Sequence, residues 1–309
     1  MGVLDGKVAI VTGAGRGVGR GEALLLAQVG AKVVVNDFGG SVAGEGSDER
    51  PASEVVEVIR SRGAEATADF EDVSDFAASE KIISHALDTY GRLDVIVNNA
   101  GILRDRMIFS MSEEDFDSVI RVHLKGTWNM MHHGAVHWRQ LAKDSGPARA
   151  SIINTVSSAG LLGQAGQSNY GAAKAGIAAL TVIGSLELGR YGIRVNAITP
   201  GGSTRIVGQA NKQLEVKEAD EYTGFDPMNP GNSAPMVAWL ASDEAAHVTG
   251  QVFRAIGNTI ARYTPWVLGE GVQALDGAGS PVQWDPQDIG PAVNGEIFGS
   301  RALGLQLRR

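Results

Sequence analysis

The chain has 309 residues, with 27 Lys and Arg against 35 Asp and Glu, so its formal net charge is −8 with the six His neutral. This length suits one large α/β domain or two smaller ones, either with a sizeable buried core. Nucleic-acid affinity depends on clustered Lys and Arg, so the acidic balance argues against a DNA- or RNA-binding protein. The sequence contains no Cys, which excludes disulfides, a thiolate zinc site and a cysteine nucleophile.

The sequence gives no sign of membrane attachment. No run of 18 apolar residues predicts a membrane-spanning helix, and Asp5 stands where a secretory signal would begin with cationic residues. We therefore expect a cytoplasmic protein without a membrane partner. Glycine is abundant, with 41 residues, which predicts many tight turns or close backbone approaches.

Short apolar, β-branched runs alternate with longer amphipathic segments over most of the chain. The runs that predict buried strands are residues 8–11, 32–35, 66–70, 95–97, 152–156, 194–198 and 251–256. The segments that predict helices are residues 19–29, 53–61, 76–90, 113–143, 170–190 and 233–241. This alternation predicts an α/β fold, with a Rossmann-like, doubly wound parallel sheet of about seven strands in a single domain over residues 1–257.

Three segments depart from this alternation. Residues 38–52 are rich in glycine and predict an exposed loop. Residues 204–230 carry many charges without an apolar stripe, which predicts a mobile lid or a helical insertion beside the site. Residues 258–309 contain Trp266 and Trp284, and because isolated Trp side chains usually bury, we expect an irregular C-terminal extension packed on the domain.

A glycine-rich turn, residues 12–19, follows the first predicted strand and opens the first helix. Glycines here let the backbone approach a pyrophosphate, whose charge meets the free amides of the helix N-terminus. The position after a strand favours dinucleotide binding over an ordinary turn. The predicted cofactor-binding residues of this turn are Gly13, Arg16, Gly17, Val18 and Gly19.

The second predicted strand leads to Asp37. A carboxylate there accepts hydrogen bonds from the adenosine ribose and repels a 2′-phosphate, which favours NAD over NADP. Arg16 has the opposite effect, since a guanidinium near the same ribose holds a 2′-phosphate. We give Asp37 more weight because repulsion at hydrogen-bonding range is the harder penalty to offset. The alternative is a solvated Asp at a strand end.

Tyr170 and Lys174 are four residues apart and lie on one face of a predicted helix. The ammonium stabilises a phenolate and lowers the tyrosine pKa, which makes Tyr170 a usable acid or base for an alcohol proton. Ser157 lies thirteen residues upstream, at the end of a predicted strand. With the glycine-rich turn, these residues favour a reaction site over a chance surface pair.

These motifs occur in the order found in the short-chain dehydrogenase/reductase family, which the chain resembles over about residues 4–257. The matching positions are the turn 12–19, Asp72-Val73, Asn98 to Gly101, Ser157, Tyr170, Lys174 and Asn196 to Gly201. Within the family the chain most resembles the (3R)-hydroxyacyl-CoA dehydrogenase unit of peroxisomal multifunctional enzyme type 2 and its bacterial single-domain relatives. The shared strings are Val33 to Asp37, Asn98 to Arg106 and Val122 to Gly126.

The resemblance implies roles for individual residues. Ser157 orients the substrate oxygen, Tyr170 exchanges its proton, and Lys174 holds the nicotinamide ribose while lowering the tyrosine pKa. The remaining implied cofactor contacts are Asp72 and Val73 at the adenine, Asn99, Ala100 and Gly101 at the ribose side, and Thr204 at the carboxamide.

His123 stands where most of the family carries an Asn that holds a water in the proton relay. The multifunctional-enzyme branch resembles this chain in having His there, so His123 is a candidate relay member. A buried core imidazole is the equally weighted alternative.

The sequence therefore predicts an NAD-dependent oxidoreductase that interconverts a secondary alcohol and a ketone, on a 3-hydroxyacyl-CoA. A steroid dehydrogenase of the 17β-hydroxysteroid type and a non-catalytic dinucleotide-binding module are the alternatives. We expect no metal, since no carboxylate adjoins His132, His133 and His137.

Helices 113–143 and 170–190 pair across two-fold axes in relatives and carry further apolar residues, which predicts a homodimer or homotetramer. Those residues include Trp128, Met131, Ile177 and Leu180.

Overall fold

The computed structural model describes residues 2–210, 215–264 and 271–296. The chain divides into two compact units, Met1–Tyr263 and Thr264–Arg309. The first unit contains every predicted site residue, and it ends six residues beyond the expected domain boundary at Gly257. Trp266 lies outside the described residues.

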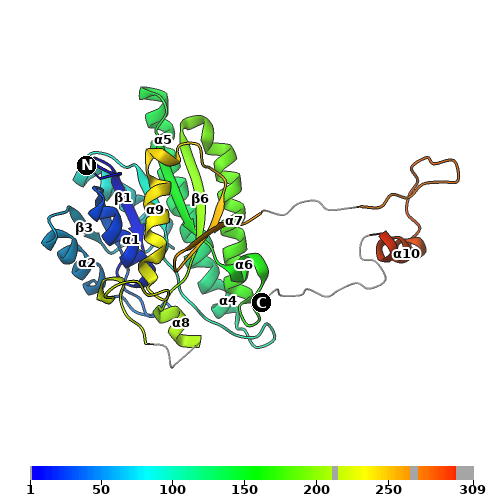
Figure 1. The fold of residues 1–309 in the computed structure, drawn as a ribbon, viewed down its shortest axis with the longest axis horizontal. Coiled ribbons are helices and arrows are strands. Elements are labelled where there is room, and N and C mark those ends of the chain that lie inside the picture. The colour runs from blue at the N-terminus through cyan, green and yellow to red at the C-terminus, as the bar shows by residue number, and fades with distance from the viewer. Residues whose placement is uncertain (1, 211–214, 265–270, 297–309) are drawn as a thin grey trace. The chain divides into compact units, whose positions relative to one another are not determined.

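One sheet of eight strands, in the order β3-β2-β1-β4-β5-β6-β7-β8, forms the centre of the first unit (Figure 1). The strands are β1 (Val8–Thr12), β2 (Lys32–Asn36), β3 (Ala66–Asp69), β4 (Val95–Asn98), β5 (Ala150–Thr155), β6 (Ile193–Pro200), β7 (Val252–Ile256) and β8 (Thr259–Arg262). Neighbours from β3 to β7 are parallel, whereas β8 is antiparallel to β7. The predicted doubly wound sheet is confirmed. The sequence does not predict β8, because all four of its residues are exposed and it has no apolar face.

Helices cover both faces of the sheet, as the strand pattern requires. One face packs against α1 (Gly17–Gln28), α2 (Arg50–Ser61) and α9 (Ala234–Ala241), and the other against α3 (Phe76–Tyr90), α5 (Gly126–Ser145) and α7 (Ser168–Leu188). Successive strand residues point to opposite faces, so Ala9 and Val11 join the first layer while Val8 and Ile10 join the second. Strands buried on both sides explain the continuous apolar runs in the sequence.

The long helix predicted over 113–143 is interrupted. It consists of α4 (Glu113–Ile120), a π-helical turn at Arg121–Lys125, and α5. A π-turn adds a residue to one turn of the helix, and such turns are frequent at functional sites. His123 lies at the centre of this turn, where it is almost fully buried.

The remaining elements are short. The segment 204–230, predicted as a lid or helical insertion, contains α8 (Arg205–Ala210) and a 3-10 turn at Ala219–Glu221. α6 (Ser158–Leu162) follows β5, and further 3-10 turns lie at Gly189–Tyr191, Pro230–Ser233 and Asp243–Ala245. In the second unit, α10 (Pro286–Glu296) forms within the tail that we expected to be irregular. The packing of that tail on the domain remains a prediction.

One helical stretch, Ser168–Tyr191, is long and apolar enough by composition to cross a membrane, which the sequence analysis does not anticipate. In the structure α7 covers β6 and buries three polar side chains, Asn169, Lys174 and Thr181. Of the apolar window of this helix 28% is buried, so α7 packs on the sheet with one face and leaves apolar residues exposed on the other.

Candidate active site

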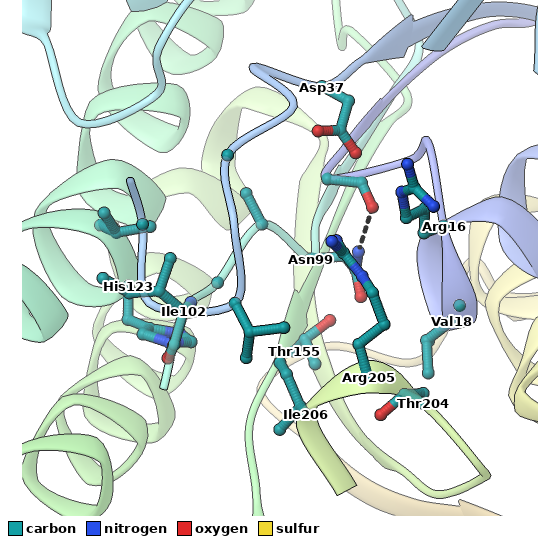
Figure 2. Close-up of a pocket in the computed structure, with 18 of the residues that line it drawn as sticks. Arg16, Val18, Asp37, Asn99, Ile102, His123, Thr155, Thr204, Arg205 and Ile206 are labelled. Carbon is teal, nitrogen blue, oxygen red and sulfur yellow. Dashed lines mark hydrogen bonds between the residues drawn. The ribbon is translucent and has the colours of Figure 1, made fainter. Parts of the chain in front are cut away.

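The carboxyl ends of the parallel strands meet in a cleft of about 300 Å³. It lies where the strand order reverses between β1 and β4, which is the usual position of ligand sites in doubly wound sheets. Predicted residues that line it are Gly13, Arg16, Gly17, Val18, Asp37, Asp72, Val73, Asn99, Ala100, Gly101, His123, Tyr170, Lys174 and Thr204 (Figure 2). Gly19 and Ser157 are not among its lining residues. The structure thus brings nearly the whole predicted set together.

The glycine-rich turn needs its glycines for close packing. Gly13 has φ +63°, and a Cβ there would lie 2.7 Å from the Cα of Ala100. At Gly19 a Cβ would lie 2.4 Å from both Asn99 Nδ2 and the Gly13 carbonyl oxygen. Asn99 Nδ2 donates hydrogen bonds to the carbonyls of Thr12 and Gly13, each at 3.0 Å. The side chain of Asn99 therefore braces the turn, a function that the resemblance does not specify.

Two guanidiniums, those of Arg16 and Arg205, lie on the same side of the cleft as Asp37 (Figure 2). Asp37 Oδ2 accepts a hydrogen bond from the Gly15 amide at 2.8 Å, and its Oδ1 accepts one from the Gly39 amide at 2.7 Å. These two bonds fix the carboxylate at the end of β2. Burial, and then repulsion by Arg16, lowers the pKa of Arg205. Arg205 belongs to α8, and no local pattern in the sequence marks it as a site residue.

Asp72, a second carboxylate that lines the cleft, is held by its own loop. Asp72 accepts hydrogen bonds from the amide and hydroxyl of Ser74 at 2.8 and 2.9 Å. The carbonyl of Val73 accepts from Asn129 Nδ2 at 2.9 Å, which ties this loop to α5. Asp72 and Val73 thus have fixed main-chain positions at the predicted adenine end.

Tyr170 and Lys174 lie one turn apart on α7, as predicted. The Lys174 ammonium donates a 2.6 Å hydrogen bond to the Thr155 carbonyl oxygen and lies 5.6 Å from the centre of the Tyr170 ring. Ser157, the N-cap of α6, accepts from the Ala159 amide at 3.2 Å. The ends of β5 and α7 therefore bring the hydroxyl, phenol and ammonium groups to one point.

The expected lowering of the Tyr170 pKa by Lys174 is not found. Burial raises the pKa of Tyr170, and a hydrogen bond with Ser157 opposes this rise, while the Asp105 carboxylate adds to it. Burial lowers the pKa of Lys174 to about 7, so the ammonium is itself poised to lose its proton near neutral pH. The prediction was wrong because it weighed the two charges without the cost of burying them.

His123 packs directly against the cofactor side of the cleft. Its Nε2 lies 2.8 Å from the Ile102 carbonyl oxygen, and a Cβ on Gly101 would lie 2.2 Å from its Cε1. The ring meets that of Tyr170 edge to face at 5.1 Å. Burial, with repulsion from Lys174, lowers the pKa of His123 to about 3, so the imidazole is neutral. This geometry favours a positioning role, and membership of the relay remains a prediction.

The first turn of α7 is held by residues that the sequence analysis does not assign to the site. Asn169, fully buried, donates to the carbonyls of Arg104 and Asp115, each at 2.9 Å. Asp105 Oδ2 accepts a 2.8 Å hydrogen bond from Gln167, the N-cap of the helix. These contacts set the position of Tyr170 from more than fifty residues away, so no local pattern reveals them.

The N-terminus of α1 binds a carboxylate in this structure, that of Glu218. The Gly17 amide donates a 2.6 Å hydrogen bond to a carboxylate oxygen of Glu218. Gly17 has φ +55°, and a Cβ there would lie 3.3 Å from Thr204 Cγ2. An amide at a helix N-terminus, next to Arg16, fits one oxygen of a dinucleotide pyrophosphate. The fold and site together define a dinucleotide-dependent α/β oxidoreductase.

Comparison with known proteins agrees with this class. Residues 7–215 match the family model described as short chain dehydrogenase. Over 292 residues the chain is 41% identical to hydroxyacyl-CoA dehydrogenase ChsB1 of Mycobacterium tuberculosis, which covers 93% of this chain and 87% of that protein. It is 39% identical to mouse peroxisomal multifunctional enzyme type 2 over 81% of this chain, which corresponds to 31% of that longer protein.

Two solved structures have the same fold. A short chain dehydrogenase from Mycobacterium avium matches with a TM-score of 0.84 and 46% identity, covering 97% of this chain and 98% of that one. The carveol dehydrogenase of the same organism, solved in complex with NAD, matches with a TM-score of 0.70 and 28% identity over 82% of this chain and 97% of that one. The chain belongs to the short-chain dehydrogenase family and is an oxidoreductase that uses a nicotinamide dinucleotide.

Proposed function

We propose that this enzyme uses NAD to interconvert the hydroxyl and keto forms of a 3-hydroxyacyl-CoA. The observation that carries the reaction is the meeting of Ser157, Tyr170 and Lys174 beside a cleft built for a dinucleotide. The substrate class rests on similarity to proteins named hydroxyacyl-CoA dehydrogenase and multifunctional enzyme.

The chain's own residues supply proton transfer and positioning. The residues of the cleft, among them Gly13, Gly17 and Asp37, would hold a nicotinamide dinucleotide, which would supply the acceptor or donor of the hydride at the carbinol carbon. The Tyr170 hydroxyl exchanges a proton with the substrate oxygen, and Ser157 holds that oxygen by a hydrogen bond. Lys174 remains next to the phenol through its bond to Thr155, and its pKa near 7 lets it pass a proton at neutral pH.

The preference for NAD over NADP rests on Asp37. Both of its oxygens accept main-chain hydrogen bonds, so the carboxylate cannot swing away from a 2′-phosphate without breaking them. Arg16 and Arg205 oppose this effect, since both are cations at the same wall. We give the carboxylate more weight because it is held at two points.

A substrate screen tests the function. Purified enzyme is incubated with NAD and, in turn, 3-hydroxyacyl-CoA thioesters of several chain lengths, steroid alcohols and simple secondary alcohols, while NADH formation is followed. We expect the highest kcat/KM on a 3-hydroxyacyl-CoA, and Ser157→Ala as the matched variant should lose that activity. A higher value on a steroid supports the alternative substrate, and NADH binding without turnover on any class supports the non-catalytic alternative.

We also propose a symmetric dimer or tetramer built on α5 and α7. Of the apolar residues on which the sequence expectation rested, Met131 and Ile177 lie in the core, 7% and 1% exposed, so they do not support an interface. Other apolar side chains on these helices are exposed, including Trp128, Val136, Leu141, Val182, Ile183 and Leu186. Light scattering at micromolar concentration should show more than one subunit, and a monomer would refute this. The cytoplasmic location remains a prediction.

A further inference from the structure

A segment of the lid region lies on the first turn of α1. Glu218 Oε2 accepts the 2.6 Å hydrogen bond from the Gly17 amide, although the two residues are 201 positions apart in the sequence. Amides at a helix N-terminus carry partial positive charge, and a carboxylate bound there is stabilised by the helix dipole. This contact is therefore a charge-assisted bond at the anion-binding end of the helix.

A second contact holds the same segment to the same helix. Asp220 pairs with Arg20 through two parallel hydrogen bonds, Nε to Oδ1 at 2.7 Å and Nη2 to Oδ2 at 2.9 Å. These side chains are only 11% and 16% exposed, so the pair is shielded from solvent. Asn229 Nδ2 also donates to the Ala219 carbonyl at 3.1 Å. The segment thus stays anchored near Gly17 whether or not Glu218 keeps its bond.

The Gly17 amide, which donates to Glu218, is also the amide that fits a pyrophosphate oxygen of the cofactor. Gly17 and Glu218 both line the cleft, together with Arg16, Thr204 and Arg205. A pyrophosphate oxygen and a carboxylate oxygen are both anionic acceptors, and a single N–H cannot serve both at full strength. The two anions would also repel each other at this distance.

We propose that Glu218 is an internal competitor for the pyrophosphate of the cofactor and so determines cofactor affinity. The inference rests on the proposed function, because it requires a dinucleotide at Gly17. Cofactor binding displaces the Glu218 side chain from the amide while the Arg20–Asp220 pair keeps the backbone of the segment in place. Part of the binding free energy of the pyrophosphate is spent on this exchange, so the wild type binds the cofactor less tightly than its cleft would otherwise allow.

Calorimetric titration with ADP-ribose, which carries the pyrophosphate but no nicotinamide, tests this without turnover. We expect Glu218→Gln and Glu218→Ala to bind ADP-ribose about three- to tenfold more tightly than the wild type, the range for an anion at a helix N-terminus. Adenosine, which has no phosphate, should bind all variants equally. Glu215→Gln is the matched control, because it removes the same charge from the same segment. Glu215 is exposed and pairs with Lys217 at 3.0 Å.

The outcomes separate this inference from the proposed function. The inference is supported if the Glu218 variants bind ADP-ribose more tightly than the wild type while Glu215→Gln does not. It is also supported if only the Glu218 variants bind ADP-ribose measurably. If the wild type binds ADP-ribose and the Glu218 variants bind it with equal or lower affinity, the inference is overturned and the proposed function stands. If ADP-ribose binds neither the wild type nor the variants, both are overturned. Glu218→Gln keeps the side-chain length, so it decides the matter even if Glu218→Ala disturbs the segment.

Discussion

Two helices of this enzyme each bury an ionisable group, with opposite consequences. Lys174 on α7 is 2% exposed, lines the cleft and bonds to the Thr155 carbonyl. Glu22 on α1 is fully buried, is not among the residues that line the cleft, and neither carboxylate oxygen has a hydrogen-bond partner among the described residues. Burial lowers the pKa of Lys174 to about 7 and raises that of Glu22 to about 8.

The difference shows that a shifted pKa does not by itself mark a catalytic group. Lys174 has a partner at a defined atom and the Tyr170 phenol beside it, and its shift fits the proton transfer that we propose. Glu22 has neither, and its shift reflects only the cost of burying charge, which keeps the carboxyl protonated. We therefore propose that α7 carries the chemistry and that the buried part of α1 serves packing.

The largest expected effect is on the α7 side. Tyr170→Phe keeps the ring that packs on His123 but removes the exchangeable proton. Turnover should fall by at least about 100-fold, the usual scale for loss of a general acid or base, while NADH affinity stays the same. Steady-state kinetics and NADH titration measure the two quantities separately, and equal turnover in the variant would remove Tyr170 from the mechanism.

On the α1 side the expected effect is on stability. Between pH 4.5, the ordinary pKa of a Glu, and about pH 8, the unfolded chain has released the Glu22 proton while the folded chain still holds it. The unfolded state then binds fewer protons, so the free energy of unfolding falls as the pH rises through this window. Glu22→Gln should remove that fall, which amounts to on the order of 5 kcal/mol at about 1.4 kcal/mol per pH unit. Urea unfolding at several pH values measures it, and a variant with an unchanged slope would contradict the assignment.

The sequence predicts the elements well where burial is regular. β1, β2, β4, β5 and β6 follow from apolar runs that are covered on both faces, whereas β3 and β7 are less buried, and the site follows from residues at the strand ends. Features that depend on contacts between distant residues cannot be predicted from the local sequence. β8 has no buried face, the π-turn at His123 interrupts a helix that the sequence predicts as continuous, and the Glu218 contact joins residues 201 positions apart.

A carboxylate that does face the cleft should behave differently from Glu22. Asp37 is predicted to make the wild type prefer NAD over NADP by at least about tenfold in kcat/KM, equivalent to about 1.4 kcal/mol. Asp37→Ser should narrow or reverse this preference, because Arg16 and Arg205 would then meet the 2′-phosphate unopposed. Kinetics with both cofactors decide it, and a wild type that prefers NADP would show that the two guanidiniums dominate.

The most direct test compares kcat in Lys174→Met and Glu22→Gln at neutral pH, with thermal unfolding as the check on folding. The account predicts that Lys174→Met loses at least about 100-fold in kcat, whereas Glu22→Gln stays within about twofold of the wild type. A Glu22→Gln variant that folds and binds NADH but loses turnover as severely, or a Lys174→Met variant that keeps it, would contradict the assignment of the chemistry to α7.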